Sequence, residues 1–387
     1  MDMPWMCRIV QWIWRIVLLL KLFTSYLLYD TPPDTVMTMD DEVLPSDTVT
    51  IMDMPDLVMK KILEDVGLVS ILTLRRVCRT FRDYIEDKGE KINVKRIHIL
   101  IQPNSVKFSL YFGSLQDDIS TKYTSNGKDF VDTFSDDLKY ILKKQKVPLD
   151  LLKIEIFTKK PMRENWNFGR RPEESLPFDD SILKNVTEKV YFSLGRILKF
   201  SEVSVRELEM EVFKKSEFIP ILQNLAPKCR MSMIIRKLAK DEGPKELLNP
   251  KEMFSHKMFK SLRKISISGF LVNQPHQMIS RKKNIEIEVP NFSKEDLLKI
   301  KEAFLAIVPE RCVLSMTKGT FERRKDHAHL VSIFGQPAND HWFPSKWYFG
   351  IPNTNDVFRV VVTWSHYIKF CRMRLQDVPE NDLPFIQ

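Results

Sequence analysis

A small group of histidine and cysteine residues in the last third of the chain has the side chains best suited to chemistry. His327 and His329 are two residues apart, His341 follows them, and Cys312 lies upstream. Imidazole and thiolate groups are common ligands of Zn²⁺. Two such groups at i and i+2 would face the same way on a strand, but helical periodicity fits this region as well. We therefore expect polar surface histidines here, with no bound metal and no cofactor.

No other motif of the chain predicts catalysis. Glycine is scarce at 11 residues, and neither G-x-G-x-x-G nor the P-loop pattern occurs, so a nucleotide site is not expected. The G-x-S-x-G element of a hydrolase is also missing. The five cysteines are odd in number and widely spaced, which favours free thiols in a reducing compartment, the cytoplasm or the nucleus. We therefore expect no catalytic residue and no enzyme activity.

Two clusters of basic residues could contact phosphate groups. They are Arg281-Lys282-Lys283 and Arg323-Arg324-Lys325, both in predicted loops. The net charge of +9 is the difference between 60 basic and 51 acidic residues, a modest excess for 387 residues. No aromatic platform for bases adjoins either cluster, so we interpret both as solvated loop charge and expect no nucleic acid partner. Aromatic residues of other predicted loops could anchor a protein interface or fill a core: Trp166, Phe168, Trp342 and Phe343.

Residues 53–90 are predicted to form a small helical unit. Asp53 can cap a first helix that has Pro55 in its first turn. The apolar residues of this helix are at helical spacing: Leu57, Val58, Ile62, Leu63 and Val66. Gly67 ends the helix, Ser70 can cap the next one, and a second apolar series follows: Ile71, Leu74, Cys78, Phe81 and Ile85. So short a unit buries little of its own surface, which predicts that it packs against another structure.

Residues 91–378 are predicted to form a mixed α/β domain. Strands near 92–101, 106–112 and 119–123 precede a helix over 130–142. A rhythm of strand, loop and helix follows, with strands at 152–157, 205–213, 230–235, 262–269, 284–289 and 312–316 and helices at 181–200, 216–225 and 293–307. Strands at 347–349, 358–364 and 367–375 end the domain, and residues 379–387 are predicted to be an extended tail.

The predicted fold class is therefore α+β, with a small N-terminal helical unit and a mixed α/β domain behind it. The central strands recur at roughly 20 to 30 residues, which makes the domain leucine-rich-repeat-like. In such an array each unit packs on its neighbours, so one long face of the sheet is open to partners.

Residues 1–29 contain a strongly apolar and aromatic stretch from 5 to 29. Its length would allow it to span a membrane, but Arg8, Arg15 and Lys21 interrupt it. It is also an imperfect signal peptide, since these cations split the apolar part. A helix lying in the membrane interface fits the segment better, and an extension without a folded role is the open alternative. Residues 30–52, rich in proline and acidic residues, are predicted to be a linker.

The helical unit resembles an F-box. Met54-Pro55 is in the place of the usual Leu-Pro pair, the first helix supplies Leu57, Val58, Ile62 and Leu63, and Val77-Cys78-Arg79-Thr80-Phe81-Arg82 matches the Val-Cys-Arg-x-Phe-Arg run of that family. The rest of the chain is similar to the FTH domain of an F-box family that is expanded in roundworms. That likeness rests on Tyr123-Thr124-Ser125-Asn126-Gly127, the strand at 262–270, and the strand at 285–289 that leads to the Ser293 helix. The two resemblances cover residues 53 to about 375.

The resemblance implies an adaptor that selects the substrate of a Skp/cullin/F-box ubiquitin ligase. It further implies that the F-box binds a Skp-type adaptor, and through it a cullin, with Pro55, Leu57, Ile62, Leu63, Leu72 and Leu74. The FTH-like domain would hold an unidentified target protein. Two alternatives stay open at this point: an adaptor for scaffolding or translational control, and a membrane-anchored enzyme whose site carries no recognised motif.

Overall fold

The computed structural model describes residues 54–89, 91–113, 118–124, 129–157, 180–226, 230–238, 245–253, 258, 261–279, 284–290, 293–306, 310–316, 323–338, 344–363 and 367–387. The contacts between residues divide the chain into two compact units, Met1–Lys91 and Ile92–Gln387. The combination of a helical first unit with a large mixed sheet in the second confirms the α+β class.

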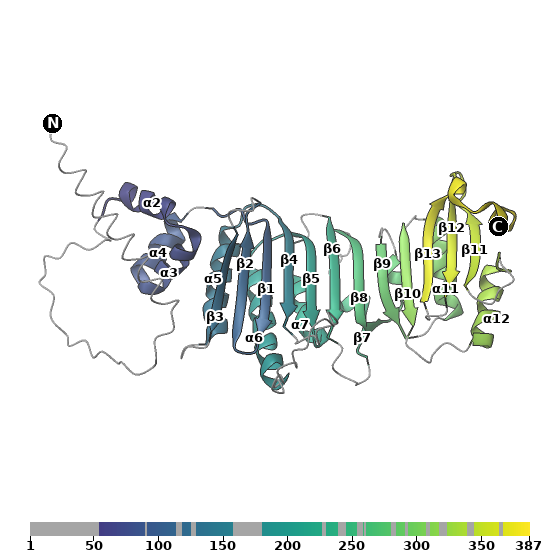
Figure 1. Ribbon diagram of the computed structural model, residues 1–387, viewed down its shortest axis with the longest axis horizontal. Coiled ribbons are helices and arrows are strands. Elements are labelled where there is room, and N and C mark those ends of the chain that lie inside the picture. The colour runs from purple at the N-terminus through teal and green to yellow at the C-terminus, as the bar shows by residue number, and fades with distance from the viewer. Residues whose placement is uncertain are drawn as a thin grey trace, which may run out of the picture. The chain divides into compact units, whose positions relative to one another are not determined.

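Three short helices form the described part of the first unit (Figure 1): α2 (Asp56–Asp65), α3 (Leu68–Val77) and α4 (Arg79–Lys88). Pro55 is the N-cap of α2 and not part of its first turn, and Asp53 is outside the described residues. Gly67 precedes α3, so the prediction that Ser70 caps this helix was wrong. The Sγ atom of Cys78 caps α4 by accepting the N–H of Phe81 at 3.4 Å.

The described strands of the second unit form one 13-stranded sheet, with the helices on the side behind the strands in Figure 1. The order is β11-β12-β13-β10-β9-β8-β6-β5-β4-β1-β2-β3, and β7 pairs only with β8. Along this order β1, β4, β5, β6, β8, β9 and β10 run parallel in succession. Because each crossover passes over the same side, successive helices pack side by side and cover one face of the sheet.

The elements of this parallel array have the following bounds: β1 (Arg96–Gln102), β4 (Leu149–Ile156), β5 (Val205–Val212), β6 (Met231–Lys237), β7 (Leu247–Leu248), β8 (Leu262–Val272), β9 (Asn284–Val289) and β10 (Arg311–Met316). The helices are α5 (Phe130–Lys144), α6 (Asp180–Phe200), α7 (Lys215–Asn224), α8 (Pro250–Met253), α10 (His276–Ile279), α11 (Lys294–Ala306) and α12 (Arg323–Phe334). The predicted rhythm of strand, loop and helix is therefore present.

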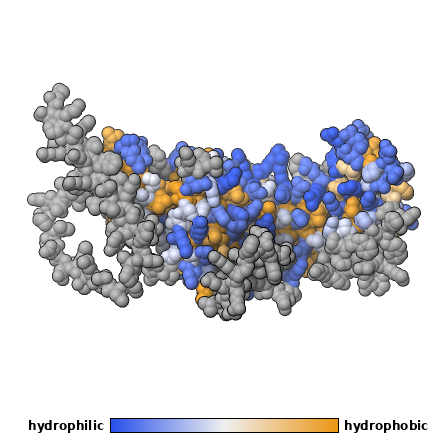
Figure 2. Space-filling model, in the orientation of Figure 1, coloured by the Kyte–Doolittle hydropathy of each residue, from blue (hydrophilic) through white to orange (hydrophobic). Residues whose placement is uncertain are grey.

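Residues alternate along the strands between a buried and an accessible face. On β5, Leu208, Met210 and Val212 are buried, whereas Glu207 and Glu209 are partly exposed. This alternation follows from the two-residue period of a strand. The accessible face mixes hydrophilic with hydrophobic residues (Figure 2).

Antiparallel strands close both ends of the array. At one end β2 (Ser105–Tyr111) pairs with β1 and with β3 (Ile119–Thr124). At the other end β13 (Tyr367–Arg374) pairs with β10 and β12 (Asp356–Val362), and β12 pairs with β11 (Ser345–Gly350).

The C-terminal tail differs from the prediction of an extended segment. Short 3₁₀ helices form at Leu375–Asp377 and Glu380–Phe385. The hydroxyl of Tyr348 donates to Asp382 at 2.7 Å, and the backbone N–H of Gln387 donates to the carbonyl of Tyr348 at 3.0 Å. The tail therefore packs against the edge strand β11, which protects an otherwise unpaired edge.

A buried carboxyl group lies at the start of α7. Glu217 accepts backbone N–H groups of Phe213 at 2.8 Å and Lys214 at 3.4 Å through Oε2, whereas its buried Oε1 has no partner in the described structure. The Oγ1 of Thr187, buried on α6, has no partner in the described part either. Burial, only partly offset by the two N–H groups, raises the pKa of Glu217 above its ordinary value.

We expect Glu217→Gln to increase stability at neutral pH more than at acidic pH. In the wild-type chain the unfolded state ionises first as the pH rises through the ordinary glutamate pKa, so stability falls until the pH passes the raised folded-state pKa. Glutamine can still accept the N–H groups but does not ionise. Urea unfolding at about pH 4 and about pH 7 measures this, and an equal effect of the substitution at both values would contradict it.

Candidate partner-binding site

The first unit exposes apolar side chains that its own fold does not cover. Leu57 on α2 is 79% exposed, and on α3 Val77 is 62% and Val69 is 39% exposed. Pro55, at the N-cap of α2, is exposed as well. Large apolar groups held at the surface of so small a unit are typical of a binding site.

Four of the residues predicted to contact a partner are buried inside the chain instead. Leu72 is 2%, Leu74 6%, Leu63 8% and Ile62 9% exposed. They belong to the core of the helical unit, together with Met59, Phe81 and Ile85. Contact of these four with a partner therefore stays a prediction, whereas Pro55 and Leu57 are exposed in the free chain.

The helical wheel explains this division. Met59, Ile62 and Leu63 are three and four residues apart, so they lie on one face of α2. Leu57 is two residues before Met59 and therefore about 200° around the helix from it. Both sides of α2 carry apolar residues, so their presence alone does not distinguish the core from the surface.

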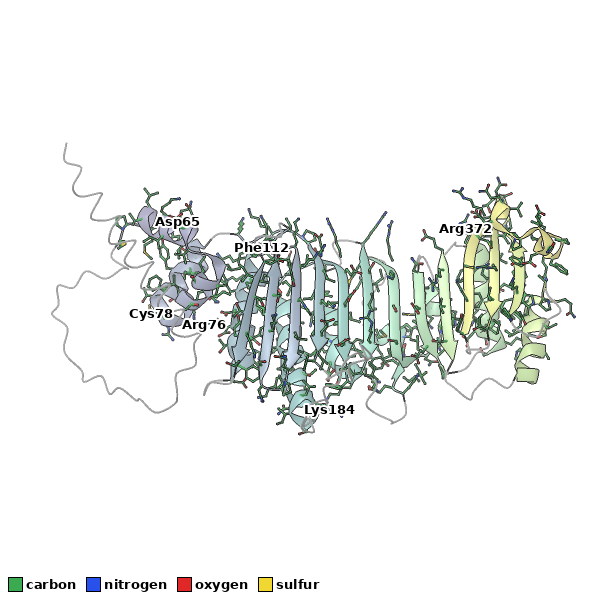
Figure 3. All side chains as sticks on the ribbon, in the orientation of Figure 1. Asp65, Arg76, Cys78, Phe112, Lys184 and Arg372 are labelled. Carbon is green, nitrogen blue, oxygen red and sulfur yellow. The ribbon has the colours of Figure 1, made fainter. Side chains whose placement is uncertain are left out.

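On α3 the outward face consists of residues four apart, Val69, Thr73 and Val77, with Arg76 beside them. Neither Val69 nor Val77 was among the residues predicted to contact a partner. With Thr73 between them they recur every four residues, on the side of α3 away from the buried Arg75, and this spacing is the signal that identifies them. Figure 3 labels Arg76 and Cys78, which mark the C-terminal end of this face.

The residues from Val77 to Arg82 lie partly in the core of the helical unit and partly at its surface. Phe81 is buried, Cys78 caps α4, and Val77 is exposed. The Arg82 Nε donates to the carbonyl of Arg75 at 3.2 Å, and the buried Arg75 pairs with Glu86 at 2.9 Å. These bonds fix α3 against α4 and hold Val77 at the junction of the two helices.

A metal site does not assemble among the described residues. No group of three potential ligands comes together there. His327 and His329 belong to α12 and not to a strand. His329 is exposed, Cys312 is buried with its thiol pKa raised by that burial, and His341 is outside the described residues.

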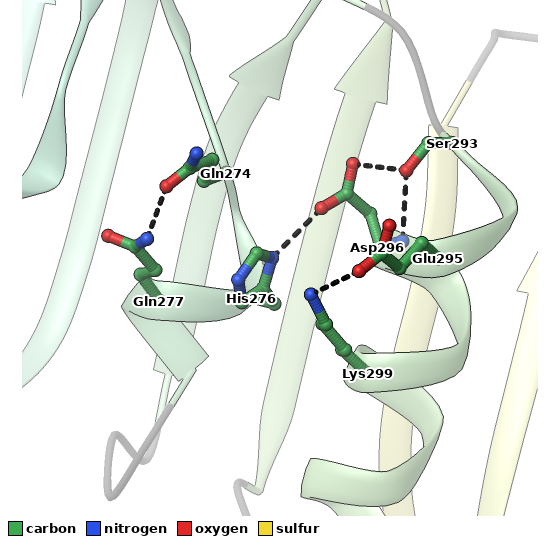
Figure 4. Close-up of polar contacts among 7 residues, drawn as sticks. All are labelled: Gln274, His276, Gln277, Ser293, Glu295, Asp296 and Lys299. Carbon is green, nitrogen blue, oxygen red and sulfur yellow. Dashed lines mark hydrogen bonds and ion pairs between the residues drawn. The ribbon is translucent and has the colours of Figure 1, made fainter.

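Ser293, Asp296 and His276 form a polar cluster that contains the residue types of a hydrolase triad (Figure 4). The Ser293 hydroxyl donates to Asp296 at 2.7 Å, and Asp296 also contacts the Nδ1 of His276 at 2.9 Å. In a triad the histidine lies between the serine and the aspartate, as base and proton carrier. Here the aspartate lies between the other two, and Ser293 Oγ accepts the backbone N–H of Asp296 at 3.0 Å. The cluster is a helix cap, as predicted for Ser293 at the start of α11.

The remaining candidates are only partly described. Arg323, Arg324 and Lys325 lie in the first turn of α12, so their prediction as loop residues was wrong. The other basic cluster, the four loop aromatic residues and residues 5–29 are outside the described residues. Among the helices that are described, none is both long and apolar enough to cross a membrane.

Comparison with protein families finds a match in each of two segments of the chain. The F-box domain model matches residues 51–93, and the FTH domain model matches residues 188–335. No curated protein and no solved structure matches the chain. An F-box domain supports a role in substrate recognition by an SCF ubiquitin ligase and binding to a Skp-type adaptor, and families with these domains are typically adaptors. The chain thus combines an N-terminal F-box domain with a C-terminal FTH domain.

Proposed function

We propose that this protein is a substrate adaptor of an SCF ubiquitin ligase, in the cytoplasm or nucleus, with no catalytic residues of its own. The F-box binds a Skp-type adaptor and through it a cullin, while the FTH-containing unit holds a target protein. The mechanism is proximity, because tethering raises the local concentration of target lysines beside the charged ubiquitin-conjugating enzyme.

The observation that carries this proposal is the set of exposed apolar side chains of the F-box: Pro55, Leu57, Val69 and Val77. The core of the unit is already filled by Ile62, Leu63, Leu72 and Leu74, so these exposed residues are free to contact another protein. Burying one leucine or valine side chain contributes about 1.5–3 kcal/mol. Two or three such contacts are enough to anchor a helical unit on its partner.

Replacing Leu57 by Asp is expected to reduce the affinity for a purified Skp-type adaptor at least about tenfold. Val77→Asp is expected to have a similar effect, since both changes put a charge where an apolar contact forms. Titration calorimetry with the full chain measures the affinity. Leu383→Asp, the same kind of change at an exposed position of the second unit, is the matched control and is expected to leave binding unchanged. Unchanged affinity of both F-box variants would refute the proposed docking surface.

The half-life of a bound target separates degradation from scaffolding. If binding leads to degradation, Leu57→Asp lengthens the half-life of the target. A half-life that stays constant while adaptor binding is lost would favour the non-degradative alternative.

A further inference from the structure

Helix α6 has an outward face that carries aromatic and basic residues. Phe192 is 65% and Phe200 81% exposed, although the inner face of the same helix is tightly buried through Val190, Tyr191 and Leu194. The helix lies on the helical side of the sheet (Figure 1), and Lys184 marks its N-terminal end in Figure 3. Two phenylalanines exposed on one helix face leave about 12 Å between them along the axis.

Some charged residues on this face form ion pairs and others do not. Lys189 pairs with Asp129 at 3.0 Å, and Glu188 pairs with Lys214 at 3.0 Å, so these charges are balanced. Arg196 and Lys199 make no ion pair among the described residues. Instead, the Arg196 guanidinium lies 5.8 Å from the ring centre of Phe192, and Lys199 Nζ lies 5.8 Å from that of Phe200. The face therefore presents two aromatic rings and two uncompensated positive charges.

The fold itself does not require these residues. Helix α6 is anchored by its other side, where Gly195 lies against Pro220 of α7 and its carbonyl accepts the side-chain amide of Asn224 at 3.1 Å. Phenylalanine and arginine are among the residues that are enriched at protein interfaces.

We propose that the outward face of α6, formed by Phe192, Arg196, Lys199 and Phe200, binds an acidic segment of the target protein that also carries apolar side chains. Carboxylates of the segment pair with Arg196 and Lys199, and its apolar side chains pack on Phe192 and Phe200. An anionic bilayer would contact the same two cations, and the experiment below includes vesicles to distinguish it from a peptide. This inference rests on the proposed role of the second unit in holding a target.

Two fluorescent synthetic peptides test this inference. The first alternates pairs of glutamate with pairs of leucine, and the matched second peptide has lysine in place of each glutamate. Fluorescence anisotropy with the full chain is expected to show binding of the acidic peptide about five- to tenfold tighter than of the basic peptide. Phe192→Ser with Phe200→Ser is expected to weaken binding of the acidic peptide by a similar factor. Arg196→Glu with Lys199→Glu is expected to invert the preference between the two peptides.

Several outcomes would overturn the inference. Equal binding of both peptides would do so, as would insensitivity of the peptide affinity to the α6 variants. Binding of the chain to phosphatidylserine vesicles that is lost in the α6 variants, without peptide binding, would assign the face to membranes. Adaptor binding is measured on the same variants and is expected to be unchanged. A failure of the α6 surface is therefore distinguishable from a failure of the F-box to bind its adaptor.

Discussion

Replacing Leu63 by Asp is expected to unfold the helical unit and thereby abolish adaptor binding. Leu63 is 8% exposed in a core shared with Ile62, Leu72 and Leu74. Removing a buried leucine side chain costs about 2–5 kcal/mol, and an unpaired carboxyl in its place adds the cost of burying a polar group. A unit of three short helices has little stability in reserve. We therefore expect the loss to exceed the stability of the unit.

Hydrogen exchange of residues 54–89 measures this effect directly. Leu63→Asp is expected to remove the protection of α2, α3 and α4 and to leave the sheet protected. Leu57→Asp is the matched control, because it introduces the same side chain six residues earlier on the same helix but at an exposed position. The Leu57→Asp variant is expected to keep full protection from hydrogen exchange while its binding to the Skp-type adaptor is weakened. Full protection of the Leu63 variant would show that the core assignment is wrong.

The two variants separate a structural from a binding role, which loss of adaptor binding alone does not do. Both variants are expected to bind the adaptor less well, but only Leu63→Asp is expected to unfold the helical unit. A test that places a charge at Leu63 therefore says nothing about whether Leu63 contacts the partner.

The strands of the parallel array were predictable because their pattern has a single explanation. In β9, Ile285, Ile287 and Val289 alternate with Glu286 and Glu288, and the strand occupies the predicted residues 284–289. Alternation with a period of two places one set under the helices and the other on the open face. The helix of Ser293 was equally clear, since the serine is followed by Glu295 and Asp296 in the first turn.

Which apolar residues of the F-box are exposed was only partly predictable. A short helix with apolar residues on both sides does not say which side faces the core, because that depends on where the neighbouring helices lie. Leu57 and Leu63 are the same residue type on the same helix, yet one is exposed and the other buried. The same reason applies to Phe192 and Phe200. They fit an apolar helix pattern, and only the packing of α6 shows that they point away from the core.

Phe358→Ala is expected to destabilise the C-terminal end of the sheet by about 3–5 kcal/mol. Phe358 on β12 is fully buried and stacks on Phe304 of α11 at 4.8 Å and on Phe370 of β13 at 5.9 Å between ring centres. Phe349 of β11 lies 5.7 Å away. The ring thus joins three strands and a helix. Its loss leaves a cavity lined by aromatic side chains, and these side chains lose the contacts that they made with the Phe358 ring.

The aromatic cluster around Phe358 lies at one end of the sheet, so we expect the destabilisation by Phe358→Ala to be local. The strands β11, β12 and β13 close the open end of the parallel array, and in an array each element is stabilised mainly by its neighbours. We therefore expect hydrogen exchange to rise first in residues 345–374 and least in the distant β4 and β5. Leu375→Ala, at a 43% exposed position just after β13, is the control and is expected to change little. A uniform rise in hydrogen exchange along the whole sheet would contradict this prediction. It would mean that the sheet unfolds as one cooperative unit, with its two ends coupled beyond the contacts between neighbouring strands.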